Sequence, residues 1–73
     1  MTDRIVMDPA ICHGKPVVNG TRTPVTVIVN ALAGGDSYAD VQSDYDISEA
    51  DIRACIAFAN REMNQQSEHP LSA

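Results

Sequence analysis

The sequence predicts a mainly α fold in which three helices follow a short N-terminal β region. Polar and apolar residues alternate over 4–7, which is typical of a short strand. Apolar residues recur at helical spacing in two later segments, 24–33 and 52–63. Helix-capping patterns begin at Ser37 and Ser48. These observations favour a single three-helix domain with strands before the helices.

The β region is predicted in two parts. Over 4–7, Ile5 and Met7 are spaced to face one side of a strand, which Asp8-Pro9 then ends. Further on, Asn19-Gly20 stands between β-favouring residues and predicts a two-residue hairpin turn of type I′.

The first helix is predicted from Thr23 to about Ala33. Thr23 is expected as the N-cap and Pro24 as the first helical residue, where its missing N–H costs nothing. Gly34-Gly35 then supplies a left-handed stop. The apolar residues expected on the buried face are Val25, Ile28, Val29 and Leu32.

Capping boxes predict the other two helices. Ser37 with Asp40 three residues later begins a short helix over about 38–44. Ser48 with Asp51 begins the longest helix. The two long helices, the short one and the turn between them match the outline of a helix-turn-helix unit.

The third helix is expected to end at about Asn64, so that 1–64 form the domain and 65–73 a disordered tail without periodicity. Ile47 is expected to pack on Ile52 as a hydrophobic staple. The apolar stripe of this helix is predicted to comprise Ile52, Cys55, Ile56, Ala59 and Met63, with Phe58 at its margin.

Length and composition predict a small cytoplasmic protein that depends on a partner. A chain of 73 residues buries only about 60% of its unfolded surface, so its core is marginal. No secretory segment is expected at the N-terminus, and the longest apolar run is far shorter than the roughly 20 residues of a membrane span. The first strand would leave backbone groups unpaired, which predicts a homodimer. Its interface is expected at Arg4, Ile5, Val6 and Met7.

The net charge of −5 is concentrated in one segment. Residues 36–51 contain six acidic residues and no Lys or Arg. Such a surface repels phosphates and attracts basic protein surfaces, although a merely solvated acidic face is the simpler interpretation. The acids are Asp36, Asp40, Asp44, Asp46, Glu49 and Asp51.

No catalytic residue, metal site or cofactor is predicted. Cys12, His13, Cys55 and His69 are suitable ligand types, but their spacing does not fit a zinc site. Both cysteines are expected as buried small apolar residues. A thiol enzyme would require Cys12 or His13 to react, and no orienting acid is evident.

Binding to DNA remains open from the residues alone. Arg53 lies one turn into the third helix, where a recognition helix presents side chains to DNA. Glu49 and Asp51 precede it and would meet phosphates unfavourably. A surface helix with scattered charge is the alternative.

The N-terminal half also carries a long specific motif. It reads Ile5-x-x-Asp8-Pro9-x-Ile11-Cys12-His13-Gly14-Lys15-Pro16-Val17-Val18-x-Gly20-Thr21-Arg22-x-Pro24-Val25. A second set comprises Leu32-Ala33-x-Gly35, Asp44-Tyr45, Ile47-Ser48 and Asp51-Ile52-Arg53-Ala54. Together they resemble domain-of-unknown-function family 433 over about residues 4 to 60. The chain departs from the family pattern at Thr23, where an aliphatic residue is usual, and in its acidic second helix.

That resemblance implies a dimeric, homeodomain-like helix-turn-helix fold and a role as the antitoxin of a bacterial type II toxin–antitoxin pair. The implied partner is a PIN-like ribonuclease toxin, and repression of the protein's own operon is left open. We expect the toxin to contact the tail and Asp36, Asp40, Asp44 and Asp46. If DNA is bound, the expected contacts are Lys15, Arg22 and Arg53. The alternative function is a non-enzymatic dimeric adaptor that binds no DNA.

Overall fold

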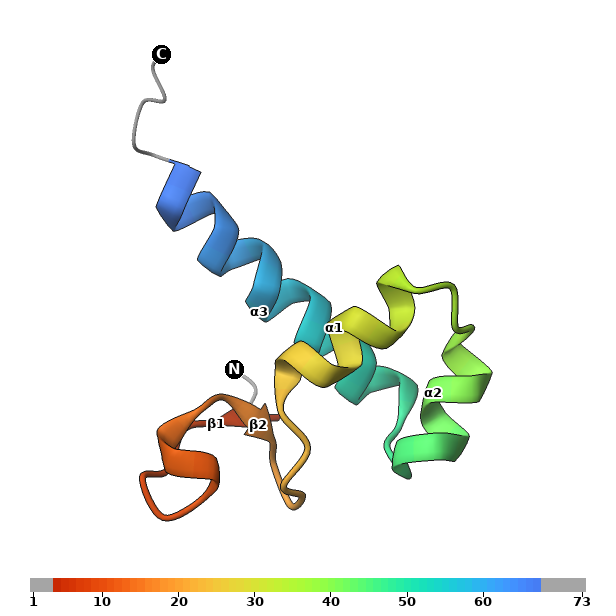
Figure 1. Cartoon of the computed structure of the whole chain (residues 1–73), viewed down its shortest axis with the longest axis horizontal. Coiled ribbons are helices and arrows are strands. Elements are labelled where there is room, and N and C mark those ends of the chain that lie inside the picture. Colours follow the sequence, from red (N-terminus) through yellow and green to blue (C-terminus); the bar gives the residue numbers. More distant parts are fainter. Residues whose placement is uncertain (1–3, 68–73) are drawn as a thin grey trace.

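The structure is a computed structural model that describes residues 4–67, and it confirms the predicted fold class (Figure 1). Within those residues, a two-stranded sheet and a 3₁₀ turn precede three α-helices. The elements are β1 (Ile5–Val6), η1 (Cys12–Gly14), β2 (Val17–Val18), α1 (Val25–Ala33), α2 (Tyr38–Tyr45) and α3 (Glu49–Ser67). In Figure 1, α1 crosses the N-terminal half of α3, and α2 lies on the far side of that crossing from the strands.

The core lies where the three helices and the sheet meet. Its largest fully buried side chains include Ile28 from α1 and Ile52 from α3. The buried cluster comprises Val18, Val25, Ile28, Val41, Ile47, Ile52 and Cys55. Ile47 and Ile52, the predicted staple, therefore both lie in it. Every helix and β2 contribute, so none of these elements buries its apolar face without the others.

The two strands pair with each other inside the chain. β1 and β2 are antiparallel, with Ile5 opposite Val18, and the Asn19 amide donates to the Arg4 carbonyl at 2.7 Å. Ile5 packs against the core, whereas Met7 is 62% exposed. The expectation that Ile5 and Met7 face one side of the same strand is wrong, because the strand ends at Val6 and Met7 lies beyond it.

The turn at Asn19-Gly20 exists, but it is not of type I′. The Thr21 amide donates to the Val18 carbonyl at 3.0 Å, and Gly20 has a φ of +86°. Asn19 is not among the residues with positive φ, whereas type I′ requires positive φ at both central positions. Positive φ at the second position alone is typical of type II. The Thr21 hydroxyl, which donates to the Val18 carbonyl at 2.8 Å and accepts from the Thr23 amide at 3.0 Å, holds this geometry.

Helix α1 begins one residue later than predicted. Pro24 occupies the N-cap with extended backbone angles, and no side chain caps the helix. Thr23 is not the cap, because its carbonyl accepts from the Val18 amide at 3.0 Å and so keeps the backbone extended. The Val25 amide, the first in the helix, donates instead to the Pro16 carbonyl at 2.9 Å.

The predicted end of α1 is confirmed: the helix ends at Ala33, and the left-handed residue that follows its C-cap is Gly35, whose φ is +108°. The Gly35 amide donates to Leu32 at 3.0 Å and the Asp36 amide to Ala31 at 3.1 Å. These two bonds form a Schellman motif, which satisfies carbonyls at the end of the helix.

Helix α3 is longer and less buried than predicted. It runs to Ser67, so 65–67 are helical, while residues 68–73 of the expected tail lie outside the described residues. Ile52 and Cys55 are buried as expected, but Ile56 is 40% exposed and Met63 is 65% exposed. For Met63 the physical reason is length: α1 spans roughly 13 Å and α3 roughly 28 Å at 1.5 Å per residue, so α1 covers only part of α3. Ile56 instead borders a hollow that it shares with Tyr38 and Arg53.

No helix in the described part of the chain is both long enough and apolar enough to cross a bilayer.

Candidate macromolecular interfaces

Four of the predicted acidic contacts surround α2. Asp36 precedes the helix, Asp40 and Asp44 lie one turn apart on it, and Asp46 is its C-cap in left-handed conformation. All four side chains are exposed. Among residues 4–67, none of these four carboxylates makes a hydrogen bond or ion pair. The structure thus places them around one short helix with their charges available to a partner.

Two of these acids lie where they destabilise the helix. The last turn of α2 contains Asp44 and no basic residue, and Asp46 follows it directly. Negative charge at a helix C-terminus opposes the helix dipole by about 0.3–1 kcal/mol per group. Asp40 and Asp44 are also like charges at i,i+4 spacing, which costs about 0.2–0.5 kcal/mol. Asp44 and Asp46 therefore do not stabilise α2 through the helix dipole.

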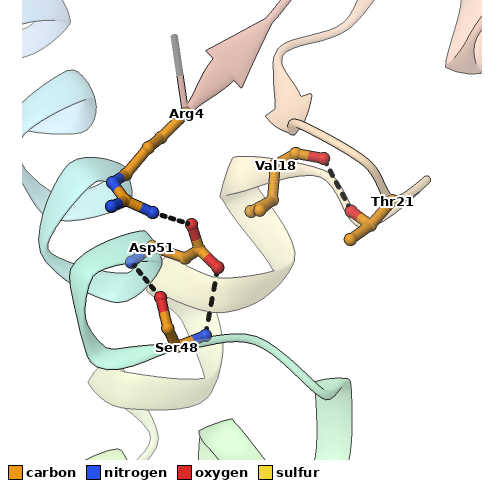
Figure 2. A network of polar contacts seen from close by, with 5 residues as sticks. All are labelled: Arg4, Val18, Thr21, Ser48 and Asp51. Atoms are coloured by element: carbon orange, nitrogen blue, oxygen red, sulfur yellow. Dashed lines mark hydrogen bonds and ion pairs between the residues drawn. The ribbon is translucent and has the colours of Figure 1, made fainter. Parts of the chain in front are cut away.

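The remaining two acids of the segment, Glu49 and Asp51, make hydrogen bonds within the fold at the start of α3. The Ser48 amide donates to Asp51 Oδ2 at 3.0 Å, and the Asp51 amide donates to Ser48 Oγ at 3.1 Å, which confirms the reciprocal capping box (Figure 2). Arg4 Nη1 donates to Asp51 Oδ1 at 3.1 Å and links the residue before β1 to α3. Figure 2 also shows the separate bond between Thr21 and Val18 that holds the turn after β2.

These contacts determine the ionisation of Asp51. Partial burial alone raises the pKa of its carboxyl. Hydrogen bonds from the Ser48 amide, the Arg4 guanidinium and the Ser48 hydroxyl, together with the positive charge of Arg4, outweigh that effect and leave the pKa below its ordinary value. Asp51 is therefore a charged structural cap rather than part of the available acidic surface.

Arg53, a predicted DNA contact, is engaged with neighbouring side chains. Its Nε and Nη2 donate to Glu49 Oε2 at 2.9 and 2.7 Å, and its guanidinium lies 5.8 Å from the centre of the Tyr38 ring. The hydrogen bond from Arg53 to Glu49 raises the pKa of Arg53. A phosphate would have to compete with Glu49 for this guanidinium.

Lys15 and Arg22, the other predicted DNA contacts, are exposed and lie in one loop region. Cys12 connects them: its carbonyl accepts from the Lys15 amide at 3.1 Å, and its thiol donates to the Arg22 carbonyl at 3.4 Å. Arg53 belongs instead to α3 beside α2. The structure therefore brings two of the three basic residues into one region and places the third on the helical side.

The cysteines and His13 differ in their surroundings. Cys55 is fully buried, as predicted, and burial, aided by the charge of Asp51, raises the pKa of its thiol to about 11. Cys12 is only partly buried, and it, His13 and Gly14 have positive φ in succession. Within residues 4–67, no group of three or more His, Cys, Asp or Glu side chains is placed to hold a metal ion, and His69 lies outside that range.

The predicted dimer residues have mixed environments. Arg4 and Met7 are exposed, and Ile5 and Val6 are half-buried. Arg4 pairs with Asp51, and β1 already uses one edge for β2.

The sequence did not reveal a groove between α1 and α3. It has a volume of about 300 Å³ and is bordered by Val29 from α1 and Met63 from α3. The helical spacing of Met63 predicted a core position, and only the unequal helix lengths could have suggested exposure.

Residues 4–67 form a three-helix unit with a small N-terminal sheet. The chain belongs to the family described as "Protein of unknown function (DUF433)", whose model matches residues 5–59, and this confirms the resemblance seen in the sequence. No curated protein matches the chain.

The chain is also similar to a solved structure, the X-ray crystal structure of Rv2018 from Mycobacterium tuberculosis. The TM-score is 0.66 and the sequence identity 27%, over 71% of this chain and 24% of that one. The chain therefore spans about a quarter of the length of the protein it matches.

Proposed function

We propose that this chain is the antitoxin of a bacterial type II toxin–antitoxin pair and neutralises a PIN-like ribonuclease by binding it in the cytoplasm. The observation that carries the proposal is a set of exposed carboxylates around α2 that have no hydrogen bond or ion pair within residues 4–67: Asp36, Asp40, Asp44 and Asp46. A nuclease that binds RNA presents a basic surface, and such a surface is complementary to this one.

The electrostatic cost in α2 supports this choice. Asp44 and Asp46 lie at the wrong end of the helix for stability, and no cation of residues 4–67 compensates them. A basic partner supplies the missing positive charge, so binding converts an unfavourable arrangement into a favourable one. Binding of this kind is expected to be fast and to weaken with salt.

Repression of the protein's own operon is a second, separate part of the proposal. Lys15 and Arg22 are exposed and available for phosphate contacts, but Arg53 is held by Glu49. The engagement of Arg53 favours the alternative function, a dimeric adaptor that binds proteins and no DNA. Fluorescence anisotropy on the promoter duplex and on a scrambled duplex, across a salt series, separates the two. Promoter-selective binding supports repression, and equal weak binding to both duplexes leaves toxin binding without repression or the adaptor.

Toxin binding is tested with a purified ribonuclease of the PIN-like class and a fluorescent RNA substrate. We expect stoichiometric inhibition of cleavage by this chain. The double variant Asp40→Lys/Asp44→Lys should weaken inhibition by about a hundredfold or more, because it replaces two attractive charges with repulsive ones.

The matched control compares two single neutralisations. Asp44→Asn and Glu62→Gln each remove one negative charge, but Glu62 lies on α3 beside the groove and not around α2. Only Asp44→Asn should weaken inhibition. Equal effects of the two would show that net charge alone matters, and full inhibition by the double variant would remove α2 from the interface.

A further inference from the structure

The groove between α1 and α3 is an apolar surface that the proposed function does not use. Its walls are Val29 on α1 and Ala59 on α3, with Met63, which is 65% exposed, at its rim. Beyond the crossing with α1, the C-terminal half of α3 extends away from the other described elements (Figure 1). A helical ridge with an exposed apolar side chain thus lies beside an open apolar groove.

This surface also has very little charge. The chain has 15 charged residues, the sum of 5 Lys and Arg and 10 Asp and Glu, but none lies between Thr23 and Gly35. The exposed residues of α1 are accordingly uncharged, among them Thr26 and Asn30. Glu62 is the one charged residue of the groove lining in the described part of the chain. Depletion of charge around an apolar centre is typical of the core of a protein–protein interface.

The lack of charge favours a second copy of this chain as the occupant. In a two-fold symmetric dimer a surface meets its own copy, so every charge near the axis meets the same charge. A chain with a net charge of −5 therefore associates with itself most easily through an almost uncharged surface. A basic partner gains most from the acidic surroundings of α2 instead. The two surfaces are thus suited to different partners.

The shape of the surface agrees with this assignment. Self-association through one patch requires that patch to carry both a projection and a matching hollow. The projecting half of α3, with Met63, and the adjacent groove bordered by Val29 meet this requirement within one surface. Strand β1 offers less, because it has two residues and pairs with β2 inside the chain.

We therefore propose that the groove between α1 and the C-terminal half of α3 binds a second copy of this chain, with each Met63 seated against α1 of its partner. This assigns the dimer interface to the helices instead of to residues 4–7. It does not depend on the antitoxin proposal, because dimerisation is measured on the purified chain alone.

Sedimentation equilibrium of the full chain and of single variants tests the assignment. Met63→Glu and Thr26→Glu place a like charge from each copy in the interface, and each should weaken dimerisation by about tenfold or more. Ile56→Glu is the matched control: Ile56 lies on the same helix, is 40% exposed and borders the hollow beside Tyr38, not the groove. It should leave the dimer intact.

A second measurement guards against unfolded variants. Far-UV circular dichroism should give the same helical signal for all of them, and dilution of the unmodified chain should shift NMR signals within 25–30 and 58–63 only. A wild-type monomer up to millimolar concentration overturns the proposal. A dimer that persists in both groove variants also overturns the proposal. An equal loss of dimerisation in Ile56→Glu overturns it as well. If dilution shifted only the NMR signals of residues 4–7, the dimer interface would lie at β1 and the proposal would be wrong.

Discussion

Arg4 and Asp51 are separated by 47 positions in the sequence and form an ion pair with 3.1 Å between Nη1 and Oδ1. The same carboxylate accepts the Ser48 amide, so one side chain both begins α3 and attaches the chain preceding β1 to it. The fold therefore uses Asp51 as a junction between its sheet and its longest helix.

Removal of this junction should destabilise the fold. We expect Asp51→Ala to lower the free energy of unfolding by about 1–2 kcal/mol, because the helix loses its capping box and its ion pair with Arg4. Urea denaturation followed by circular dichroism measures this. Arg4→Met removes the exposed ion pair with Asp51 but leaves the capping box, and it should cost at most about 1 kcal/mol. A larger loss in Arg4→Met than in Asp51→Ala would contradict the dominant role of the cap.

The lowered pKa of Asp51 predicts a dependence of stability on acid. A carboxyl whose folded pKa is below its unfolded value stabilises the fold above the unfolded pKa, and that contribution is lost as the pH falls through the folded pKa. The unfolded reference is 3.8, so the loss should occur below about pH 4. Denaturation curves at pH 7, 4 and 3 should show a steeper decline for the wild type than for Asp51→Asn. Parallel declines would show that other carboxyls account for the acid sensitivity.

The raised pKa of Cys55 predicts the opposite dependence in base. An acid group whose folded pKa lies above its unfolded value favours the fold while it is protonated, and this contribution is lost as the pH rises from the unfolded value, 9.0, to the folded one, about 11. Cys55→Ala should therefore show a smaller decline of stability between pH 9 and 11 than the wild type, although it begins from lower stability because of its cavity.

The same burial protects Cys55 from reagents. Iodoacetamide at neutral pH, followed by peptide mass spectrometry, should modify the partly buried Cys12 before the buried Cys55. The single-thiol variant Cys12→Ser should react only on the timescale of unfolding. Rapid reaction of that variant under native conditions would contradict the burial of Cys55.

Replacement of aspartate by asparagine should have opposite effects on stability at the two ends of α2. Asp40→Asn removes a favourable charge from the first turn and should lower stability, whereas Asp44→Asn removes an unfavourable one from the last turn and should raise it, each by about 0.3–1 kcal/mol. Both relieve the same mutual repulsion, so their difference isolates the dipole. The difference should shrink in high salt. A stabilised Asp44→Asn that also inhibits the ribonuclease less would separate folding from binding at this residue.

Neighbouring glycines after α1 provide a further matched pair. Gly35 has a φ of +108°, and Gly35→Ala should cost about 1–2 kcal/mol although a methyl group there has open space around it. Gly34 has a φ of −81°, which suits alanine, and Gly34→Ala should be neutral or stabilise by about 0.4–1 kcal/mol. Thermal denaturation compares the two. Equal midpoints would show that Gly35 can change its conformation without cost.

The sequence predicted the features that depend on neighbouring residues. The capping box of Ser48 and Asp51 and the stop at Gly35 involve bonds over three to five positions and are present. Of the box predicted for Ser37 and Asp40, the bond from the Asp40 amide to Ser37 Oγ is present, and among residues 4–67 the reciprocal bond to the Asp40 carboxylate is not. Short-range hydrogen bonds of this kind leave a signature in the order of the residues. Family membership was likewise predictable, because the motif through Gly14 and Gly20 lies in one continuous segment. The acidic residues around α2 could be predicted as a group because they also lie in one continuous segment.

Only the tertiary structure decided which residues meet across the chain. Thr23 does not cap α1 as predicted, because its carbonyl accepts a hydrogen bond from the Val18 amide. Met63 is exposed and not in the core as predicted, because α3 is about twice as long as α1. The bond between Arg53 and Glu49 joins residues four positions apart on α3, but the Tyr38 ring that Arg53 lies beside belongs to α2. Hydrophobic periodicity and capping residues indicate which secondary structure each segment favours by itself. Whether a side chain is buried or available to a partner depends on which other segments cover it.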